Sequence, residues 1–211
     1  MDMWHIGLVL TKCFINATCC YGMNHISNCI LRYCSDLFLA DVQDAWKGKH
    51  VHVLLSKIGA YKLFFWDIMN VRPNSELESE VINAYLLLLV NKRNQISVEK
   101  VSYIDSFAMT NLWNGKSQRL KINPVEYKLI VGIVNEHKHW KLAAIMPGAK
   151  RSLLVDPLGE SQMDIKKCLE STRAFMRKKG CNVSRWTCGT VPHPRQQDST
   201  SCGVFALKVC I

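Results

Sequence analysis

The chain has 211 residues, of which 48% are hydrophobic and 21% are charged, with a formal net charge of +10 at pH 7. This composition does not indicate a disordered chain, because it supplies enough apolar side chains for a packed core. No stretch approaches the roughly 20 apolar residues of a membrane helix, and no basic segment precedes the short apolar run at residues 6–10, so neither a membrane span nor a cleaved leader is expected.

The positive charge is spread unevenly along the chain. Basic and acidic residues balance over residues 1–50, so the whole excess lies after residue 50. A basic domain can favour acidic protein partners or nucleic acid, although a solvated basic surface gives the same composition. The basic residues of 166–179 lack interleaved aromatic side chains on their polar side, so nucleic acid is the least favoured partner.

The ten cysteines form an N-terminal and a C-terminal group with none between them. Since no secretion signal accompanies them, reduced thiols inside a cell are expected rather than a disulfide framework. The chain has no Cys-x-x-Cys pair. Although His5 and His25 lie among the first group of cysteines, no metal site is predicted.

The first half of the chain predicts few regular elements. Residues 1–50 show no clear periodicity and are left unassigned, whereas the apolar and aromatic residues 51–68 predict short strands interrupted at Gly59. A proline followed by three glutamates then favours a helix start, and the apolar residues from Val81 to Leu89 predict a buried helix. A second helix is predicted from residue 106 to residue 113.

The second half predicts a meander of strands followed by two helices. Strands are expected at residues 128–134, 139–146 and 151–156, because β-branched and apolar runs alternate there with short polar turns. An amphipathic helix is expected from Ser161 to Gly180, with basic residues in its last turn. A final apolar helix is expected to begin at residue 202.

Cys202 is the candidate nucleophile. It follows a run of small polar residues and begins the predicted helix, where backbone N–H groups stabilise a thiolate. Gly203 leaves room for a substrate backbone. A buried, inert cysteine is the ordinary alternative. The assignment of Cys202 as a nucleophile therefore depends on the presence of the other candidate catalytic residues.

His139 and Asp156 are the candidate base and its orienting carboxylate. His139 begins one predicted strand and Asp156 ends the next, so a hairpin would place the two side by side. An imidazole next to a carboxylate is what a nucleophilic triad requires. Gln196 and Gln197 lie in the loop before Cys202, where an amide N–H could stabilise a developing oxyanion.

These segments resemble the ubiquitin-like-protein proteases, which include the sentrin/SUMO-specific peptidases. His139-Trp140 is similar to that family's catalytic His-Trp, and residues 154–158 are similar to its strand-ending Tyr-Asp-Ser-Leu. Residues 194–205 match Pro-x-Gln-x-Asn-x-x-Asp-Cys-Gly-x-Phe in spacing, which gives the oxyanion role to Gln196 rather than to its neighbour. Residues 77–86 resemble the family's Leu-Asn-Asp-x-Val-Ile-Asn-x-Tyr-Leu helix.

The resemblance implies an α+β fold, the papain-like cysteine protease fold in circularly permuted order, with a nucleophile helix against a central antiparallel or mixed sheet. It implies catalytic roles for His139, Asp156, Gln196 and Cys202, and a substrate-binding role for Trp140. The implied activity is hydrolysis after the C-terminal di-glycine of SUMO or another ubiquitin-like modifier. No metal, organic cofactor or membrane partner is implied, and the expected location is the nucleus or cytoplasm.

The chain departs from the family pattern at three places. Glu76 stands where the family has a tryptophan that partners Trp140, and Asp198 and Ser201 replace an Asn and an Asp before the nucleophile. The chain also stops at Ile211, where the family continues, so the catalytic domain expected over residues 51–211 is interpreted as truncated and less stable than a longer form.

Two functions of different classes therefore stay open. The first is a cysteine peptidase or isopeptidase, favoured by the presence of all four catalytic residues. The alternative is a catalytically impaired domain that only binds a modifier, favoured by Glu76 and the short C-terminal segment.

Overall fold

The structure is a computed structural model that describes residues 42–72 and 74–209. The chain divides into two compact units that meet in sequence between Leu87 and Leu88. All of the candidate catalytic residues belong to the second unit. Among the described residues, no helix is both long enough and apolar enough to cross a bilayer.

The first unit contains the predicted pair of strands. Residues 42–46 are helical, and β1 (Leu54–Ile58) pairs antiparallel with β2 (Tyr61–Phe64). Gly59 lies in the turn between them with φ of 60°, and a Cβ there would stand 2.5 Å from the side chain of Leu87. The interruption predicted at Gly59 is therefore the turn of a hairpin.

The segment that follows β2 corrects the sequence prediction. Residues 65–68 were expected to be strand, but α4 (Phe65–Met69) is a helix. The carboxylate of Asp67 accepts a hydrogen bond of 2.7 Å from the backbone N–H of Phe64, which caps the first turn. The helix then buries Phe65 and Ile68 in a small core with two residues of the preceding helical segment, Val42 and Ala45.

The buried helix predicted after Pro73 is α5 (Ser79–Ile96), which crosses the division between the two units. It begins later than the glutamates suggested, since Glu80 is the acidic residue of its first turn. Of the predicted apolar face, Val81, Ile82, Tyr85 and Leu86 are buried, whereas Leu88 and Leu89 are half-buried.

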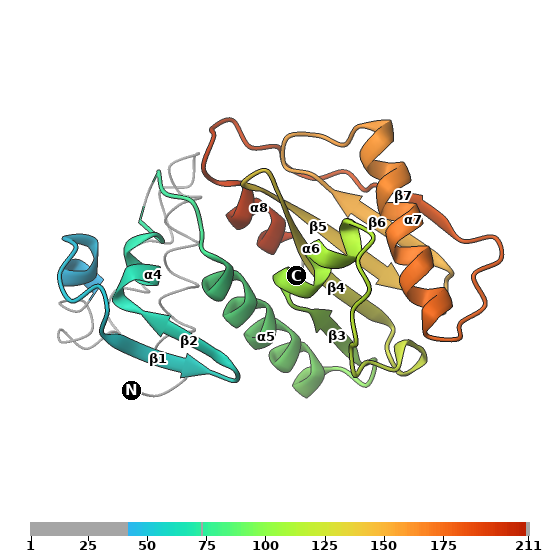
Figure 1. Ribbon diagram of the computed structural model, residues 1–211, viewed down its shortest axis with the longest axis horizontal. Coiled ribbons are helices and arrows are strands. Elements are labelled where there is room, and N and C mark those ends of the chain that lie inside the picture. Colours follow the sequence, from blue (N-terminus) through green and yellow to red (C-terminus); the bar gives the residue numbers. More distant parts are fainter. Residues whose placement is uncertain (1–41, 73, 210–211) are drawn as a thin grey trace. The chain divides into compact units, whose positions relative to one another are not determined.

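The second unit is built on a five-stranded mixed sheet in the order β3-β4-β5-β6-β7 (Figure 1). The strands are β3 (Val101–Ile104), β4 (Leu129–Glu136), β5 (His139–Met146), β6 (Arg151–Val155) and β7 (Thr187–Gly189). The three central strands form the predicted antiparallel meander, whereas β3 pairs with β4 and β7 pairs with β6 in parallel.

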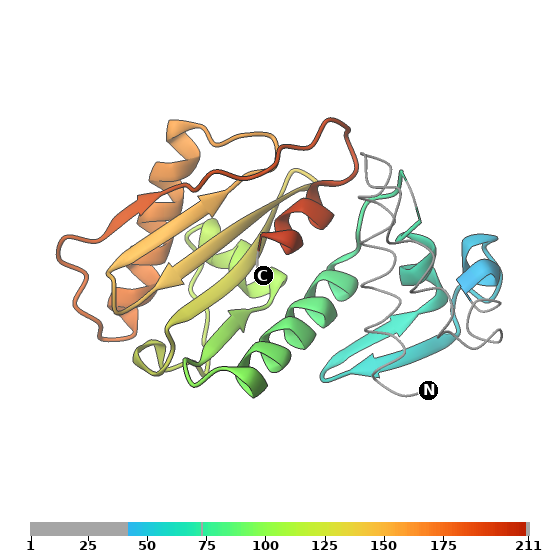
Figure 2. The same ribbon diagram turned by 180° about the vertical axis from the view of Figure 1, so that it is seen from behind.

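The helices α6 (Ser106–Trp113) and α7 (Gln162–Lys178) lie on the same face of this sheet (Figures 1 and 2). Both begin at a side-chain cap, because Asp105 accepts from the backbone N–H of Ala108 and Ser161 accepts from that of Asp164. A short 3-10 helix, η2 (Pro124–Glu126), precedes β4. The apolar residues between these helices and β4–β6 form the core of the unit.

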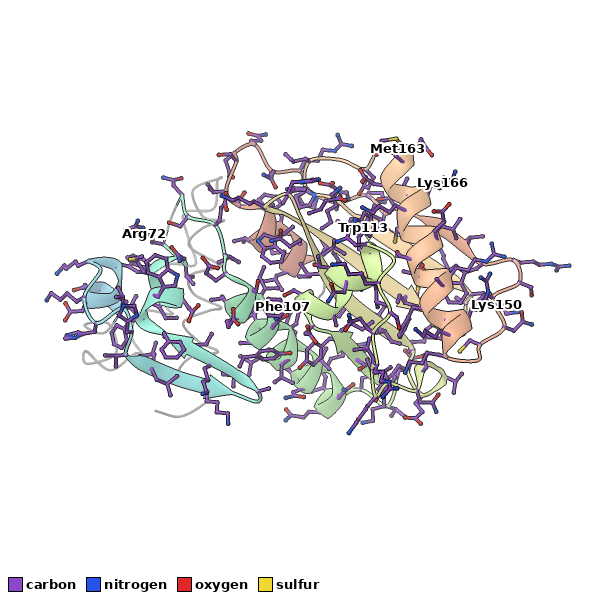
Figure 3. All side chains as sticks on the ribbon, viewed as in Figure 1. Arg72, Phe107, Trp113, Lys150, Met163 and Lys166 are labelled. Carbon is purple, nitrogen blue, oxygen red and sulfur yellow. The ribbon has the colours of Figure 1, made fainter. Side chains whose placement is uncertain are left out.

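The two C-terminal helices follow the predicted patterns. In α7, Cys168, Phe175 and Met176 are buried, whereas Met163 and Lys166 are exposed on its outer side (Figure 3). The last helix, α8 (Cys202–Lys208), contacts β5 and thereby joins the candidate nucleophile to the strand that begins with the candidate base.

Candidate active site

His139 and Asp156 are held next to each other by neighbouring strands. His139 is the first residue of β5, and Asp156 follows the last residue of β6. The strands pair antiparallel with Leu142 opposite Val155, so the start of one lies beside the end of the other. His139 Nε2 lies 2.6 Å from Asp156 Oδ1, and the two side chains are 17% and 5% exposed.

The side chain of Cys202 also contacts the His139 ring. This cysteine is the first residue of α8 and is buried. Hydrogen bonds of the ring to the Asp156 carboxylate and to the Cys202 side chain raise the pKa of His139 from 6.5 to about 9. Since Nε2 is engaged by the carboxylate, Nδ1 is the ring nitrogen left for the sulfur.

The Asp156 carboxylate is kept ionised despite its burial. Burial raises its pKa, but the hydrogen bond from His139, the backbone N–H of Leu158 and the nearby positive charges outweigh this effect, so the pKa lies below its ordinary value. The Leu158 N–H donates to Oδ1 over 2.8 Å. A negative charge is therefore fixed beside the imidazole at neutral pH.

Gln196 lies in the loop between β7 and α8 and is 7% exposed. Its backbone N–H donates to the carbonyl of Pro157 over 3.0 Å, which ties the loop to the turn after Asp156. Its side-chain Nε2 donates to the carbonyl of Asp198 over 2.7 Å, whereas Oε1 is buried without a partner among the described residues. The amide keeps a second N–H for another acceptor.

Asp198 organises the residues just before the nucleophile. Its Oδ1 accepts from the backbone N–H groups of Thr200 and Ser201, each at 2.8 Å, and its Oδ2 accepts from the Ser201 hydroxyl at 2.8 Å. Asp198 and Ser201, which both depart from the family pattern, are thus hydrogen-bonded to each other. Asp198 supplies the acceptor that shapes this loop, and Ser201 supplies two of its donors.

A second contact fastens the same loop to Asp156. His193 Nε2 lies 2.9 Å from the backbone oxygen of Asp156, and its Nδ1 lies 2.8 Å from that of Val191. The turn after Asp156 contains Gly159 with φ of 104°, and a Cβ there would stand 2.8 Å from the Arg195 guanidinium. The positive φ therefore favours glycine at this position, whereas the flexible arginine side chain could move aside for a Cβ.

A cluster of charged residues that sequence patterns did not predict lies next to Asp156. Lys141 Nζ lies 3.4 Å from Asp156 Oδ2, 3.0 Å from Glu136 Oε2 and 2.9 Å from Asp164 Oδ1. Lys167 Nζ lies 2.5 Å from Glu136 Oε1. The signal in the sequence was a lysine inside the otherwise apolar stretch 140–145.

Trp140, the predicted substrate-binding residue, follows His139 in β5 and is 3% exposed. Its substrate-binding role stays a prediction. Within the described residues no three His, Cys, Asp or Glu side chains are arranged to hold a metal ion. The cysteines at 168, 181, 188 and 202 are free thiols. His5 and His25, which were considered as metal ligands, lie outside the described residues.

The arrangement has the groups that a nucleophilic cysteine site requires. A thiol contacts an imidazole, a buried carboxylate lies at Nε2 of the same ring, and an amide-bearing loop leads to the thiol. A positively charged imidazolium beside a sulfur favours its thiolate form. The residues present therefore fit the chemistry of a cysteine peptidase.

Comparison with known proteins gives the family. Residues 75–210 match the model of the Ulp1 protease family, C-terminal catalytic domain. The chain belongs to this family, a family of cysteine proteases.

Curated relatives are similar over most of this chain but over a small part of their own. A sentrin-specific protease of Caenorhabditis elegans is 24% identical over 178 residues, which cover 79% of this chain and 26% of the relative. Human sentrin-specific protease 2 is 25% identical over 167 residues, which cover 74% of this chain and 28% of the relative. The chain thus spans about a quarter of the length of these relatives.

Solved structures confirm the predicted α+β fold. The Ulp1 protease domain in complex with Smt3, the yeast orthologue of SUMO, superposes with a TM-score of 0.66 at 15% identity, covering 84% of this chain and 83% of that one. A Ulp1-like SUMO protease domain of Chaetomium thermophilum gives 0.64 at 22% identity, covering 82% and 76%.

Proposed function

We propose that this chain is a cysteine isopeptidase that cleaves after the C-terminal di-glycine of SUMO or of another ubiquitin-like modifier. The observation that carries the proposal is that the His139 ring contacts both the Asp156 carboxylate and the Cys202 side chain. The family membership supports a peptidase rather than an unrelated thiol enzyme.

In the proposed reaction the Cys202 thiolate attacks the carbonyl carbon of the terminal glycine of the modifier. As the C–N bond breaks, the His139 imidazolium gives its proton to the leaving amine, and the modifier is left as a thioester on the sulfur. His139 then takes a proton from water, which attacks the thioester. Cys202 leaves as the thiolate and His139 is an imidazolium again, while the modifier is released as a carboxylic acid that loses its proton to solvent.

Asp156 and Gln196 have supporting roles in this proposal. Asp156 keeps Nε2 of His139 occupied, so that Nδ1 serves the sulfur. The second N–H of the Gln196 amide is the candidate donor to the oxyanion that develops on the carbonyl oxygen. Its fixed position supports this role, because the side chain is buried and already bonded to the Asp198 carbonyl.

SUMO is the modifier we favour, since the curated relatives are named sentrin-specific proteases and one similar structure is a complex with yeast SUMO. We further propose that Trp140 contacts the di-glycine, and that the protein acts in the nucleus or cytoplasm. Conjugates of SUMO are the expected partners.

The test is hydrolysis of isopeptide-linked conjugates of SUMO, ubiquitin and other ubiquitin-like modifiers by the purified chain. We expect free SUMO to be released, and Cys202→Ala to release none. Release of another modifier alone would support the proposed peptidase activity but would show that SUMO is not the substrate. Binding of a modifier with no release would support the alternative, a catalytically impaired modifier-binding domain.

A further inference from the structure

Lys141 is a buried lysine in the middle of an apolar strand. Its side chain is 8% exposed, and its neighbours Trp140, Leu142 and Ala143 are buried apolar residues. An ammonium group is strongly hydrated, so burial of a lysine is sustained only where charged or polar partners replace the water. The partners of Lys141 therefore indicate what stabilises this lysine in a buried position.

Those partners come from β4, from α7 and from the residue that follows β6, which is the proposed catalytic carboxylate. Lys141 Nζ lies 2.9 Å from Asp164 Oδ1 on α7, 3.0 Å from Glu136 Oε2 on β4 and 3.4 Å from Asp156 Oδ2. The strand register explains the last contact. Since Leu142 is paired with Val155, the next residues along the two antiparallel chains, Lys141 and Asp156, stand opposite each other.

The two oxygens of the Asp156 carboxylate thus face two different cationic side chains. Oδ1 faces His139 at 2.6 Å and Oδ2 faces Lys141 at 3.4 Å. With a separate partner on each oxygen, rotation of the carboxylate is opposed from both sides. We propose that Lys141 is a positioning residue of the active site, which offsets part of the Asp156 charge through Oδ2 and thereby sets how strongly Oδ1 holds the proton of His139. This inference rests on the proposed catalytic roles of His139 and Asp156.

The surroundings of Lys141 hold its own position. The Glu136 carboxylate receives the indole N–H of Trp113 and the Lys167 ammonium on Oε1, which leaves Oε2 for Lys141. Trp113, at the C-terminal end of α6 (Figure 3), also lies beneath both ammonium groups, at 5.7 Å from Lys141 and 5.0 Å from Lys167. The charged groups around Lys141 are Glu136, Asp156, Asp164, Lys167 and, across the Asp156 carboxylate, His139.

Removal of the Lys141 charge should change the titration of His139. In Lys141→Met the Asp156 charge is no longer shared, and one positive neighbour of the imidazolium is gone. His139 should then hold its proton to a higher pH, by about one pH unit, the lower end of the effect of a close charge. Because Lys141 does not contact substrate in this proposal, kcat should fall by about 10-fold to 10²-fold while KM changes little.

The experiment follows the His139 ring of the full chain by NMR across pH, with His139→Gln to assign its signal among the seven histidines. It compares Lys141→Met, Lys141→Arg and Lys167→Met, and it measures kcat and KM on a SUMO conjugate. We expect a higher titration pH in Lys141→Met, recovery toward the original value in Lys141→Arg, and a smaller change in Lys167→Met, which reaches the cluster through Glu136. An unchanged titration in Lys141→Met, or an equal change in Lys167→Met, would overturn the proposal.

Asp164→Asn decides the question if Lys141→Met does not fold. Asp164 is 22% exposed and tolerates a polar replacement better than the buried lysine does. Loss of this carboxylate leaves Lys141 more strongly directed to Asp156, so His139 should titrate at a lower pH, and no change would overturn the proposal. If the unchanged chain hydrolyses no conjugate, the proposed function fails, yet the titrations still decide whether Lys141 controls the Asp156–His139 pair.

Discussion

His139 Nε2 lies 2.6 Å from Asp156 Oδ1, although the two residues are 17 positions apart in the sequence. A single hairpin between β5 and β6 brings them together, so the pair needs no contact between distant parts of the chain. Cys202 reaches the same ring from α8, which packs on β5. The site therefore combines a local pair with one long-range contact.

Loss of His139 should lower activity more than loss of Asp156. In the proposed mechanism His139 moves the protons, and removal of such a group costs about 10²–10⁴-fold in rate. Asp156 only orients the ring and stabilises its charge. The measurement is kcat/KM for His139→Ala and Asp156→Ala on one SUMO conjugate, and a slower Asp156→Ala enzyme would contradict the assignment.

Gln196 and Gln197 should differ sharply. Gln196 is buried and bonded to the loop, whereas Gln197 is exposed. We expect Gln196→Ala to lower kcat by about 10²-fold with KM nearly unchanged, as for the loss of an oxyanion donor. Gln197→Ala is the matched control and should be nearly neutral. The opposite order would shift the oxyanion role to Gln197.

The pH dependence should follow His139, whose pKa the hydrogen bonds to Asp156 and Cys202 raise from 6.5 to about 9. Turnover should decline as pH rises through about 9, because the proton for the leaving amine is lost there. Folding stability should also decline with rising pH. The raised pKa of His139 stabilises the fold fully below pH 6.5, and this contribution disappears as pH rises toward 9.

A pH–rate profile and urea unfolding between these pH values test both statements. The variant His139→Gln is the control and should lose this part of the pH dependence of unfolding. An alkaline decline of turnover centred near 6.5, the ordinary histidine value, would show that the ring is not held as described.

Acid should destabilise the second unit through Glu136. Burial raises the pKa of this carboxyl, but hydrogen bonds from Lys167, Trp113 and Lys141 outweigh it and lower the pKa from 4.5 to about 2. A lowered pKa stabilises the fold above 4.5, and this contribution is lost as pH falls toward 2. The urea midpoint should drop over this range, less steeply in Glu136→Gln, and identical slopes in the two proteins would be contrary to the prediction.

Much of the second unit could be predicted from the sequence because its signals are local. The meander follows from apolar strands separated by short polar turns, and α7 follows from its cap at Ser161 and its amphipathic period. The segment after β2 was predicted wrongly, since aromatic residues such as Phe65 fit either a strand or a helix. The hydrogen bond from Phe64 to Asp67 decides for the helix.

In the candidate site, too, the contacts between neighbouring strands could be predicted from the sequence, whereas the contacts between distant segments could not. The proximity of His139 and Asp156 follows from the order of two strands, whereas the Lys141 cluster depends on contacts among β4, β5 and α7. Periodicity could not indicate which carboxylates a buried lysine would meet. The lysine itself was visible in the sequence as the charged residue that interrupts an apolar strand.

The central claim, that Cys202 is the nucleophile of a modifier-specific peptidase, is tested most directly by covalent capture. The purified chain is exposed to SUMO that carries an electrophilic group at its C-terminus, and the modified residue is identified by mass spectrometry. The account predicts one SUMO attached to Cys202, none attached in Cys202→Ala, and undiminished capture in Cys181→Ala, which removes a partly buried thiol elsewhere. Capture that persists in Cys202→Ala, or a folded chain that captures no modifier, would contradict it.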